Sequence, residues 1–363
     1  MEADDRYKLE NMLLRSYLHF RYFKLKARFK ATKDLHFEGL PKHYSNNSMT
    51  RMQGSRYLMH VYNCHTEGLE SYCCDVGTLT AERLEVNNRF GSRSCFVDGQ
   101  YMLVVRYNNP MTIFRGLIEI GQIKFNAKYE FCKNDHFLYG RYAQHIGHSV
   151  YAMENGASLY RIEWQDIKDG KYVKTLVKED VNSFYVDRRL GLATLNTSNS
   201  LTLPNGTVVD LKAKVDSKAT WTLVTCIAEY WIACGDRDLD IDSHAILASV
   251  DKQGRVRSKL TLKLTSNGYK KRDGVMFAGI FSLQNVFITG RRGIMLAIER
   301  DGCCHLISVT YGRMSKLQSI ASIDVAGSYE RNRIVLSVTT TGTKGEFIAG
   351  GENWTRRIRL KLK

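Results

Sequence analysis

The chain is poor in proline and has no long apolar run. Its 363 residues include only three prolines, and no Ser/Gly-rich or low-complexity stretch resembles a linker. No run of 18 apolar residues is present, so no membrane-spanning helix is expected. Acidic residues near the start, Glu2, Asp4 and Asp5, are unlike a signal peptide. We therefore expect one large domain in a cytoplasmic or nuclear protein.

Catalytic signatures are also missing. The sequence contains no Gly-x-Ser-x-Gly, no Gly-x-Gly-x-x-Gly and no phosphate-binding loop. Ser, His and Asp residues occur, but no spacing links them to a strand–turn–helix context. We expect the protein not to be an enzyme and to carry no cofactor.

Metal-ligand spacings are incomplete. The nine cysteines include no Cys-x-x-Cys pair, and the adjacent Cys73 and Cys74 on a strand would point to opposite faces. Asp236–Asp242 resembles the start of a calcium loop, but Ile241 and Leu247 stand where a glycine and a glutamate are required. We expect a solvated loop there, free thiols in a reducing compartment, and no bound metal.

Positive charge is in excess. With 53 Lys and Arg against 37 Asp and Glu, the formal net charge is +16. Such a balance favours acidic partners, whether protein surfaces, nucleic acid or anionic lipid. Charge alone does not choose among them.

Short apolar strands recur along the chain. The clearest are centred near residues 60, 103, 150, 192, 232, 288 and 348, with a mean interval of about 48 residues. Val, Ile, Thr, Tyr and Phe dominate these runs, as in β-strands. A period of this length with four short strands per unit is typical of a β-propeller.

Phe347–Leu362 consists of a small apolar strand, the pair Gly350-Gly351, a polar turn and an alternating strand. This pattern resembles half of a WD-repeat blade, although no Trp-Asp dipeptide occurs. The resemblance covers residues 55–363 and implies a disc-shaped scaffold whose faces bind macromolecules. We predict an all-β fold, a single propeller of about seven four-stranded blades.

Both ends of the chain alternate apolar and basic residues. Residues 23–31 do so, as do the residues from Arg357 to the C-terminus. We predict that the strand 23–31 completes the last blade, formed by 332–363, and thereby removes an exposed sheet edge. Residues 1–22 would form an extension, either a short helix or a continuation of the strand.

Basic residues supply the candidate binding surface. The pair Arg291-Arg292 resembles the arginine core of phosphoinositide-binding propellers, and we place it in a turn between the second and third strands of a blade; a tight basic turn without a ligand is the alternative. The full predicted set is Lys24, Lys26, Arg28, Lys30, Arg291, Arg292, Arg357, Arg359 and Lys361.

The predicted function is a non-enzymatic scaffold that mediates protein–protein interactions within a larger intracellular assembly. Its partners would carry acidic surfaces. Two alternatives stay open: a nucleic-acid-binding propeller of a ribonucleoprotein, and a propeller that binds phosphoinositides through Arg291 and Arg292.

Overall fold

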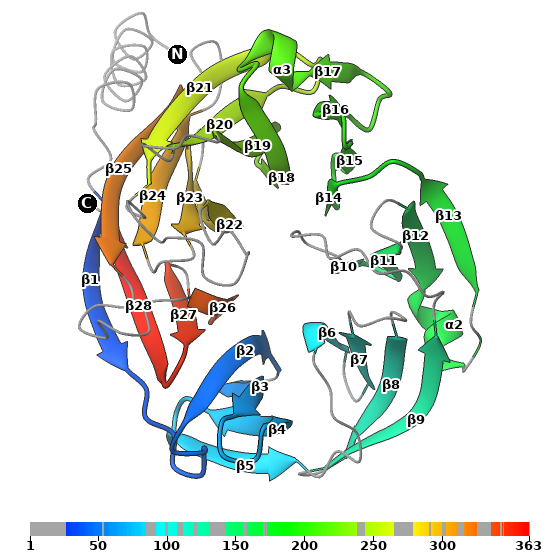
Figure 1. The fold of residues 1–363 in the computed structure, drawn as a ribbon, viewed down its shortest axis with the longest axis vertical. Coiled ribbons are helices and arrows are strands. Elements are labelled where there is room, and N and C mark those ends of the chain that lie inside the picture. Colours follow the sequence, from blue (N-terminus) through cyan, green and yellow to red (C-terminus); the bar gives the residue numbers. More distant parts are fainter. Residues whose placement is uncertain are drawn as a thin grey trace, which may run out of the picture.

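Strands dominate the structure. The computed structural model describes residues 27–362 apart from internal segments, the longest of which are 85–91, 107–111, 131–142, 238–243, 265–278, 311–315 and 325–334. The described strands form seven four-stranded antiparallel sheets around a central axis (Figure 1). Two short helices accompany them, α2 (Trp164–Lys168) and α3 (Leu211–Lys214). The prediction of an all-β propeller is confirmed.

Six sheets are each built from four consecutive strands. In chain order they comprise β2 (Tyr44–Arg51), β3 (Arg56–Asn63), β4 (Gly68–Asp75) and β5 (Thr80–Leu84); β6 (Ser92–Asp98), β7 (Tyr101–Arg106), β8 (Thr112–Glu119) and β9 (Gln122–Glu130); β10 (Ala143–Ile146), β11 (Ser149–Glu154), β12 (Ser158–Glu163) and β13 (Lys174–Lys178); β14 (Ser183–Asp187), β15 (Gly191–Leu195), β16 (Ser200–Thr202) and β17 (Val208–Asp210); β18 (Ala219–Ile227), β19 (Tyr230–Arg237), β20 (His244–Val250) and β21 (Val256–Lys263); and β22 (Ile280–Thr289), β23 (Arg292–Glu299), β24 (Cys303–Thr310) and β25 (Lys316–Asp324).

The remaining sheet joins the two ends of the chain. Its strand order is β1-β28-β27-β26, built from β1 (Ala27–Asp34), β26 (Val335–Thr340), β27 (Glu346–Gly351) and β28 (Trp354–Leu362). The pairing of β1 with β28 runs from Ala27 opposite Leu362 to Asp34 opposite Arg356, and the register shifts between Phe29 and Ala31. The N-terminal strand thus lies beside the C-terminal strand, and it extends to Asp34, beyond the predicted end at residue 31. Residues 1–26, including the proposed extension, lie outside the described residues.

Most of the apolar runs in the sequence mark the second strand of a sheet. This holds for six of the seven runs, which fall on β3, β7, β11, β15, β19 and β27. The exception is the run at Ile288, which belongs to β22, a first strand. The turn after it therefore lies between the first and second strands, and its predicted place between the second and third was wrong. β22 is as apolar in sequence as its neighbour β23, so the pattern alone could not show which of the two is the second strand of the sheet.

The core lies between neighbouring sheets. On β19, Ile232 and Cys234 pack with Met295 and Ile307 of the following sheet. The alternate residues Trp231 and Ala233 pack with Leu201 and other residues of the preceding sheet. Because successive side chains of a strand point to opposite faces, a strand between two packed sheets is buried on both sides. This arrangement explains why the second strands are continuous apolar runs.

Within the described residues, no helix is both long and apolar enough to cross a membrane.

Candidate interaction surface and buried polar cluster

The basic face of β28 is paired with acidic groups of the same sheet. Glu346 on β27 is 8% exposed, and its carboxylate lies close to the guanidinium groups of Arg357 and Arg359, both of which belong to the predicted basic set. Arg359 Nε donates to Glu346 Oε2 at 2.5 Å, and Arg357 Nε lies 3.6 Å from Oε1. Arg357 also donates to the backbone carbonyl of Val76, at 3.3 Å, from the neighbouring sheet. These two cations therefore contribute to the cohesion of the fold, and only Arg359, with 54% of its side chain exposed, is largely accessible.

The other predicted basic residues are described only in part. Lys24, Lys26 and Arg291 lie outside the described residues. Arg28 pairs by backbone with Lys361, whereas Lys30 falls at the register shift of β1. Arg292 is the first residue of β23, opposite Thr289. The structure thus brings Arg28 and Lys361 together, and places Arg292 on a different sheet.

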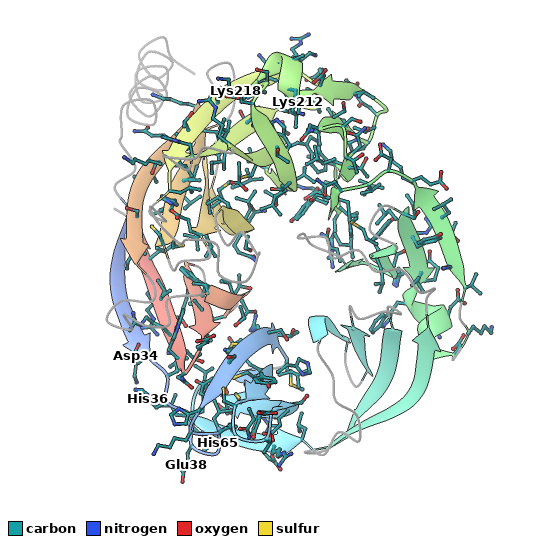
Figure 2. The ribbon with its side chains drawn as sticks, in the orientation of Figure 1. Asp34, His36, Glu38, His65, Lys212 and Lys218 are labelled. Carbon is teal, nitrogen blue, oxygen red and sulfur yellow. The ribbon has the colours of Figure 1, made fainter. Side chains whose placement is uncertain are left out.

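A second basic surface is formed by α3, the loop that follows it and the strand β21. We call it the α3–β21 patch. It comprises six exposed cations: Lys212, Lys214, Lys218, Arg257, Lys259 and Lys263. Along β21 the side chains of Arg257, Lys259 and Lys263 are exposed, because alternation along a strand turns the residues between them, such as Leu262, into the core. Lys212, on α3, and Lys218, just after it, lie at the outer edge of the ring (Figure 2).

One buried carboxylate holds part of this patch in place. Asp216, whose side chain is 3% exposed, accepts Lys259 Nζ at 2.9 Å and Arg237 at 3.0 Å. Burial alone would raise the pKa of Asp216, but hydrogen bonds from Lys259, the backbone of Lys218 and Arg237 hold that pKa below its usual value. Asp216 therefore stays ionised at neutral pH, and it neutralises only a fraction of the charge around it.

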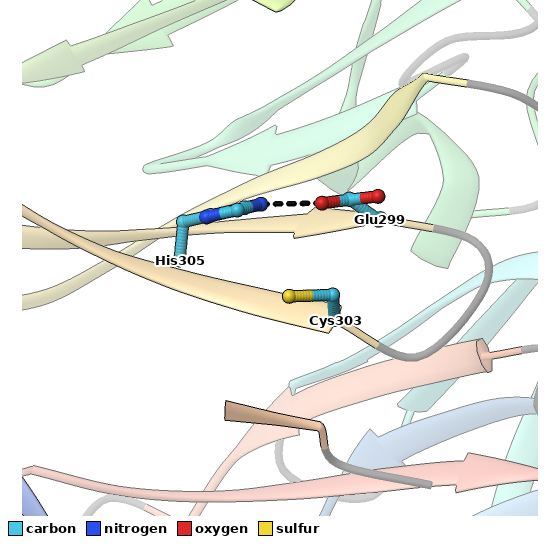
Figure 3. A group of neighbouring side chains, drawn as sticks. All are labelled: Glu299, Cys303 and His305. Atoms are coloured by element: carbon cyan, nitrogen blue, oxygen red, sulfur yellow. Dashed lines mark hydrogen bonds and ion pairs between the residues drawn. The ribbon is translucent and has the colours of Figure 1, made fainter. Parts of the chain in front are cut away.

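A separate polar cluster is buried within the sheet β22–β25. Glu299, Cys303 and His305 are 1%, 7% and 6% exposed, and their potential ligand atoms all lie within 4.8 Å of one another. Glu299 Oε1 and His305 Nε2 form a hydrogen bond (Figure 3). These three groups are the types that bind transition metals in proteins.

Asp236 lies near this cluster on β19. Burial raises the pKa of Asp236 to about 7, and the negative charge of Glu299 adds to the rise. Its Oδ1 atom is buried without a hydrogen-bond partner. The expectation of a solvated loop from Asp236 onward was wrong for this residue and for Arg237, which belong to β19; residues 238–243 lie outside the described part.

The cysteines considered as zinc ligands are separated. Cys64 is exposed, Cys73 is half-buried and Cys74 is buried, all three as free thiols. Cys74 packs in the core with Tyr57 and Met59, and burial raises the pKa of its thiol well above the usual range. The adjacent cysteines thus face opposite sides of β4, as predicted.

Sequence reasoning missed both the buried cluster and the α3–β21 patch. A signal for the cluster was present: Cys303 and His305 are two residues apart on a strand, which places both on one face. Glu299 joins them only through the cross-strand register of β23 and β24. The patch joins charges from segments that are about 40 residues apart in the sequence, so no local run reveals it.

Comparison with known proteins finds structures of the same fold and no relative by sequence. No family model matches the chain, and no curated protein matches it. Among solved structures, one titled "Structure of U3-55K" aligns with a TM-score of 0.55 at 13% identity, covering 90% of this chain and 98% of that one. A chain of the mitotic checkpoint complex gives a TM-score of 0.56 at 10% identity, with 93% and 95% covered.

A third structure, of BBS1N in complex with ARL6DN, gives a TM-score of 0.50 at 8% identity and covers 94% of this chain and 98% of that one. Similarity at such low identity establishes the fold only. The neighbours are propellers of the WD40 type, which confirms the resemblance inferred from Phe347–Leu362.

Proposed function

We propose that this protein is a non-enzymatic propeller scaffold that binds acidic protein partners within a larger intracellular assembly. The fold supports the proposal, because a propeller offers a rigid disc with wide surfaces for docking. Two of its structural neighbours were solved within complexes, by their titles the mitotic checkpoint complex and BBS1N with ARL6DN.

The observation that carries the proposal is the α3–β21 patch. Six exposed cations lie on α3, on the loop that follows it and on β21. Among the described residues, Asp216 contacts Lys259, and Asp251 contacts Arg257 at 2.6 Å. Clustered positive charge raises the association rate with an acidic surface and weakens with added salt. The patch is therefore a better candidate for the docking surface than Arg357 and Arg359, which both pair with Glu346.

The terminal residues form the second part of the proposal. We assign to the β1–β28 pairing the role of closing the ring, with Lys24, Lys26, Arg28, Lys30 and Lys361 extending a basic surface over that sheet. The same proposal places the protein in the cytoplasm or the nucleus, which fluorescence microscopy of the tagged full chain would test.

The experiment compares three charge-neutralised variants of the full chain in affinity capture from native extract, followed by mass spectrometry. The first carries Lys212→Gln, Lys214→Gln and Lys218→Gln. The second carries Gln at Lys24, Lys26, Arg28 and Lys30. The control replaces three exposed lysines elsewhere, Lys42, Lys171 and Lys252, by Gln.

We expect the first variant to lose protein partners that the wild type and the control retain, with capture that weakens as salt rises. Equal capture by the first variant and the control would refute the role of the patch. Nuclease-sensitive capture of RNA, or flotation with phosphoinositide vesicles that depends on Arg291 and Arg292, would instead support the nucleic-acid or lipid alternative.

A further inference from the structure

The end of the β23–β24 hairpin carries three metal-binding types of side chain. Within this hairpin, Ile298 lies opposite Cys304 and Ala297 lies opposite His305. Glu299 and Cys303 are the next residue of each strand toward the turn. The three side chains are therefore cross-strand neighbours, set by backbone register and not by loop geometry.

All three side chains face the neighbouring sheet. Met295 and Ala297 of β23, and Ile307 and Val309 of β24, pack against β18–β21. Glu299, Cys303 and His305 have the same parity along their strands, so they point to the same face. The opposite face, which includes Cys304 and Leu306, packs toward β26–β28.

We propose that Glu299, Cys303 and His305 bind one zinc ion between the sheets β18–β21 and β22–β25. Carboxylate oxygen, thiolate sulfur and imidazole nitrogen are all zinc ligands, at about 2.0–2.3 Å from the metal. Ligand atoms of a tetrahedral site then lie about 3.3–3.8 Å apart. The observed spacing, within 4.8 Å, needs only small side-chain rotations to reach this geometry. The inference departs from the expectation, drawn from the sequence, that the chain has no metal.

Electrostatics of the interface favour a dication. A buried carboxylate is stabilised by a nearby positive charge, and Glu299 is 1% exposed. Asp236 adds a second carboxylate: it shares the parity of Ile232 and Cys234 on β19, so it faces the same interface. Its buried Oδ1 has no hydrogen-bond partner in the described part of the chain.

Zinc binding also has a defined proton balance. A hydrogen bond joins Glu299 to His305, and Cys303 forms no disulfide. Coordination of the neutral imidazole of His305 through Nε2 places its ring proton on Nδ1, and the thiol proton of Cys303 passes to solvent when the thiolate binds the metal. The affinity for zinc should therefore fall as pH is lowered.

The test uses the full chain, stripped with a chelator and then titrated with Zn²⁺ against a chromophoric competitor. Co²⁺ serves as a second probe, because its charge-transfer absorption reports a thiolate ligand. We expect one equivalent of metal and a thiolate band that is lost in Cys303→Ser. Glu299→Gln and His305→Gln should weaken binding by more than about tenfold, since even indirect contacts to a metal are worth that much.

Cys304→Ser is the matched control, because Cys304 is the next residue on the same strand and faces away from the site. Cys64→Ser controls for binding at an exposed thiol. Circular dichroism of each variant identifies any that fail to fold, and Glu299→Gln, which conserves size, keeps the test informative in that case. Absence of a stoichiometric site at micromolar Zn²⁺, or a thiolate band that survives in Cys303→Ser, would overturn the proposal.

Discussion

His60 should make the stability of the fold depend on pH. This residue lies on β3, opposite Ser71 of β4, and only 2% of it is exposed. Its Nδ1 lies 2.8 Å from Ser71 Oγ, and its buried Nε2 has no hydrogen-bond partner among the residues that the structure describes. Burial lowers the pKa of His60 from 6.5 to about 4, because the charged imidazolium would lose its hydration.

The sign of the effect follows from proton uptake. Between about pH 6.5 and pH 4 the unfolded chain binds a proton at His60 that the folded chain does not. The free energy of unfolding therefore falls as pH decreases through this window. A pKa change from 6.5 to about 4 corresponds to a total of about 3 kcal/mol, of which about 2 kcal/mol is lost between pH 7 and pH 5.

The assay is urea unfolding at pH 7 and pH 5, followed by tryptophan fluorescence, for the wild type and for His60→Gln. Glutamine is uncharged at both pH values and can still bond Ser71, so the variant should lose about 2 kcal/mol less than the wild type on acidification. His36→Gln, at an exposed site, is the control and should behave as the wild type does. The same acid-induced loss in His60→Gln and in the wild type would refute the reasoning.

Three further predictions concern the sheet that joins the termini and a tight turn beside its neighbour. Deleting residues 1–31 removes most of β1 and leaves the edge of β28 unpaired, so the truncated protein should aggregate or fail to fold, as size-exclusion chromatography would show; a soluble monomer of native stability would contradict the pairing. Glu346→Gln should lower stability by about 1–3 kcal/mol in thermal unfolding, because Arg357 and Arg359 lose the buried carboxylate they share; an unchanged Tm would show that the pair contributes nothing. Gly39→Ala should cost at least about 1–3 kcal/mol, because Gly39 has φ +98° and a Cβ there would lie 2.1 Å from the carbonyl oxygen of Ala81; chemical denaturation that shows no loss would count against this geometry.

The sequence was informative where a strand is buried on both faces. β19 and β27 are continuous apolar runs because each packs between two sheets, and their spacing along the chain predicted the propeller. The same logic misplaced Ile288, since β22 is also apolar and a period cannot tell the first strand from the second. The alternation at both termini predicted the β1–β28 pairing, because one face of each strand is apolar.

The candidate sites were harder to predict, for a physical reason. Whether a basic side chain is available to a partner depends on acidic residues of other strands. The sequence pattern gave Arg359 no acidic neighbour, yet Glu346 lies directly opposite it on the adjacent strand. Likewise, Glu299 and His305 meet only because the register of the hairpin aligns them. A local sequence pattern indicates which face of a strand is apolar or charged. It does not indicate which other strand that face contacts.

The sheet shared by the two ends has a consequence for synthesis of the protein in the cell. β1 leaves the ribosome before the other described strands, and its partner β28 leaves after them. Contacts between them span more than 300 residues, as in the ion pair of Asp34 with Arg356 at 2.6 Å. During translation β1 therefore stays without its partner strand while the other sheets form. Such long-range pairing is slow, and it leaves a strand edge that is prone to aggregation. The nascent chain should accordingly depend on chaperones until β28 emerges.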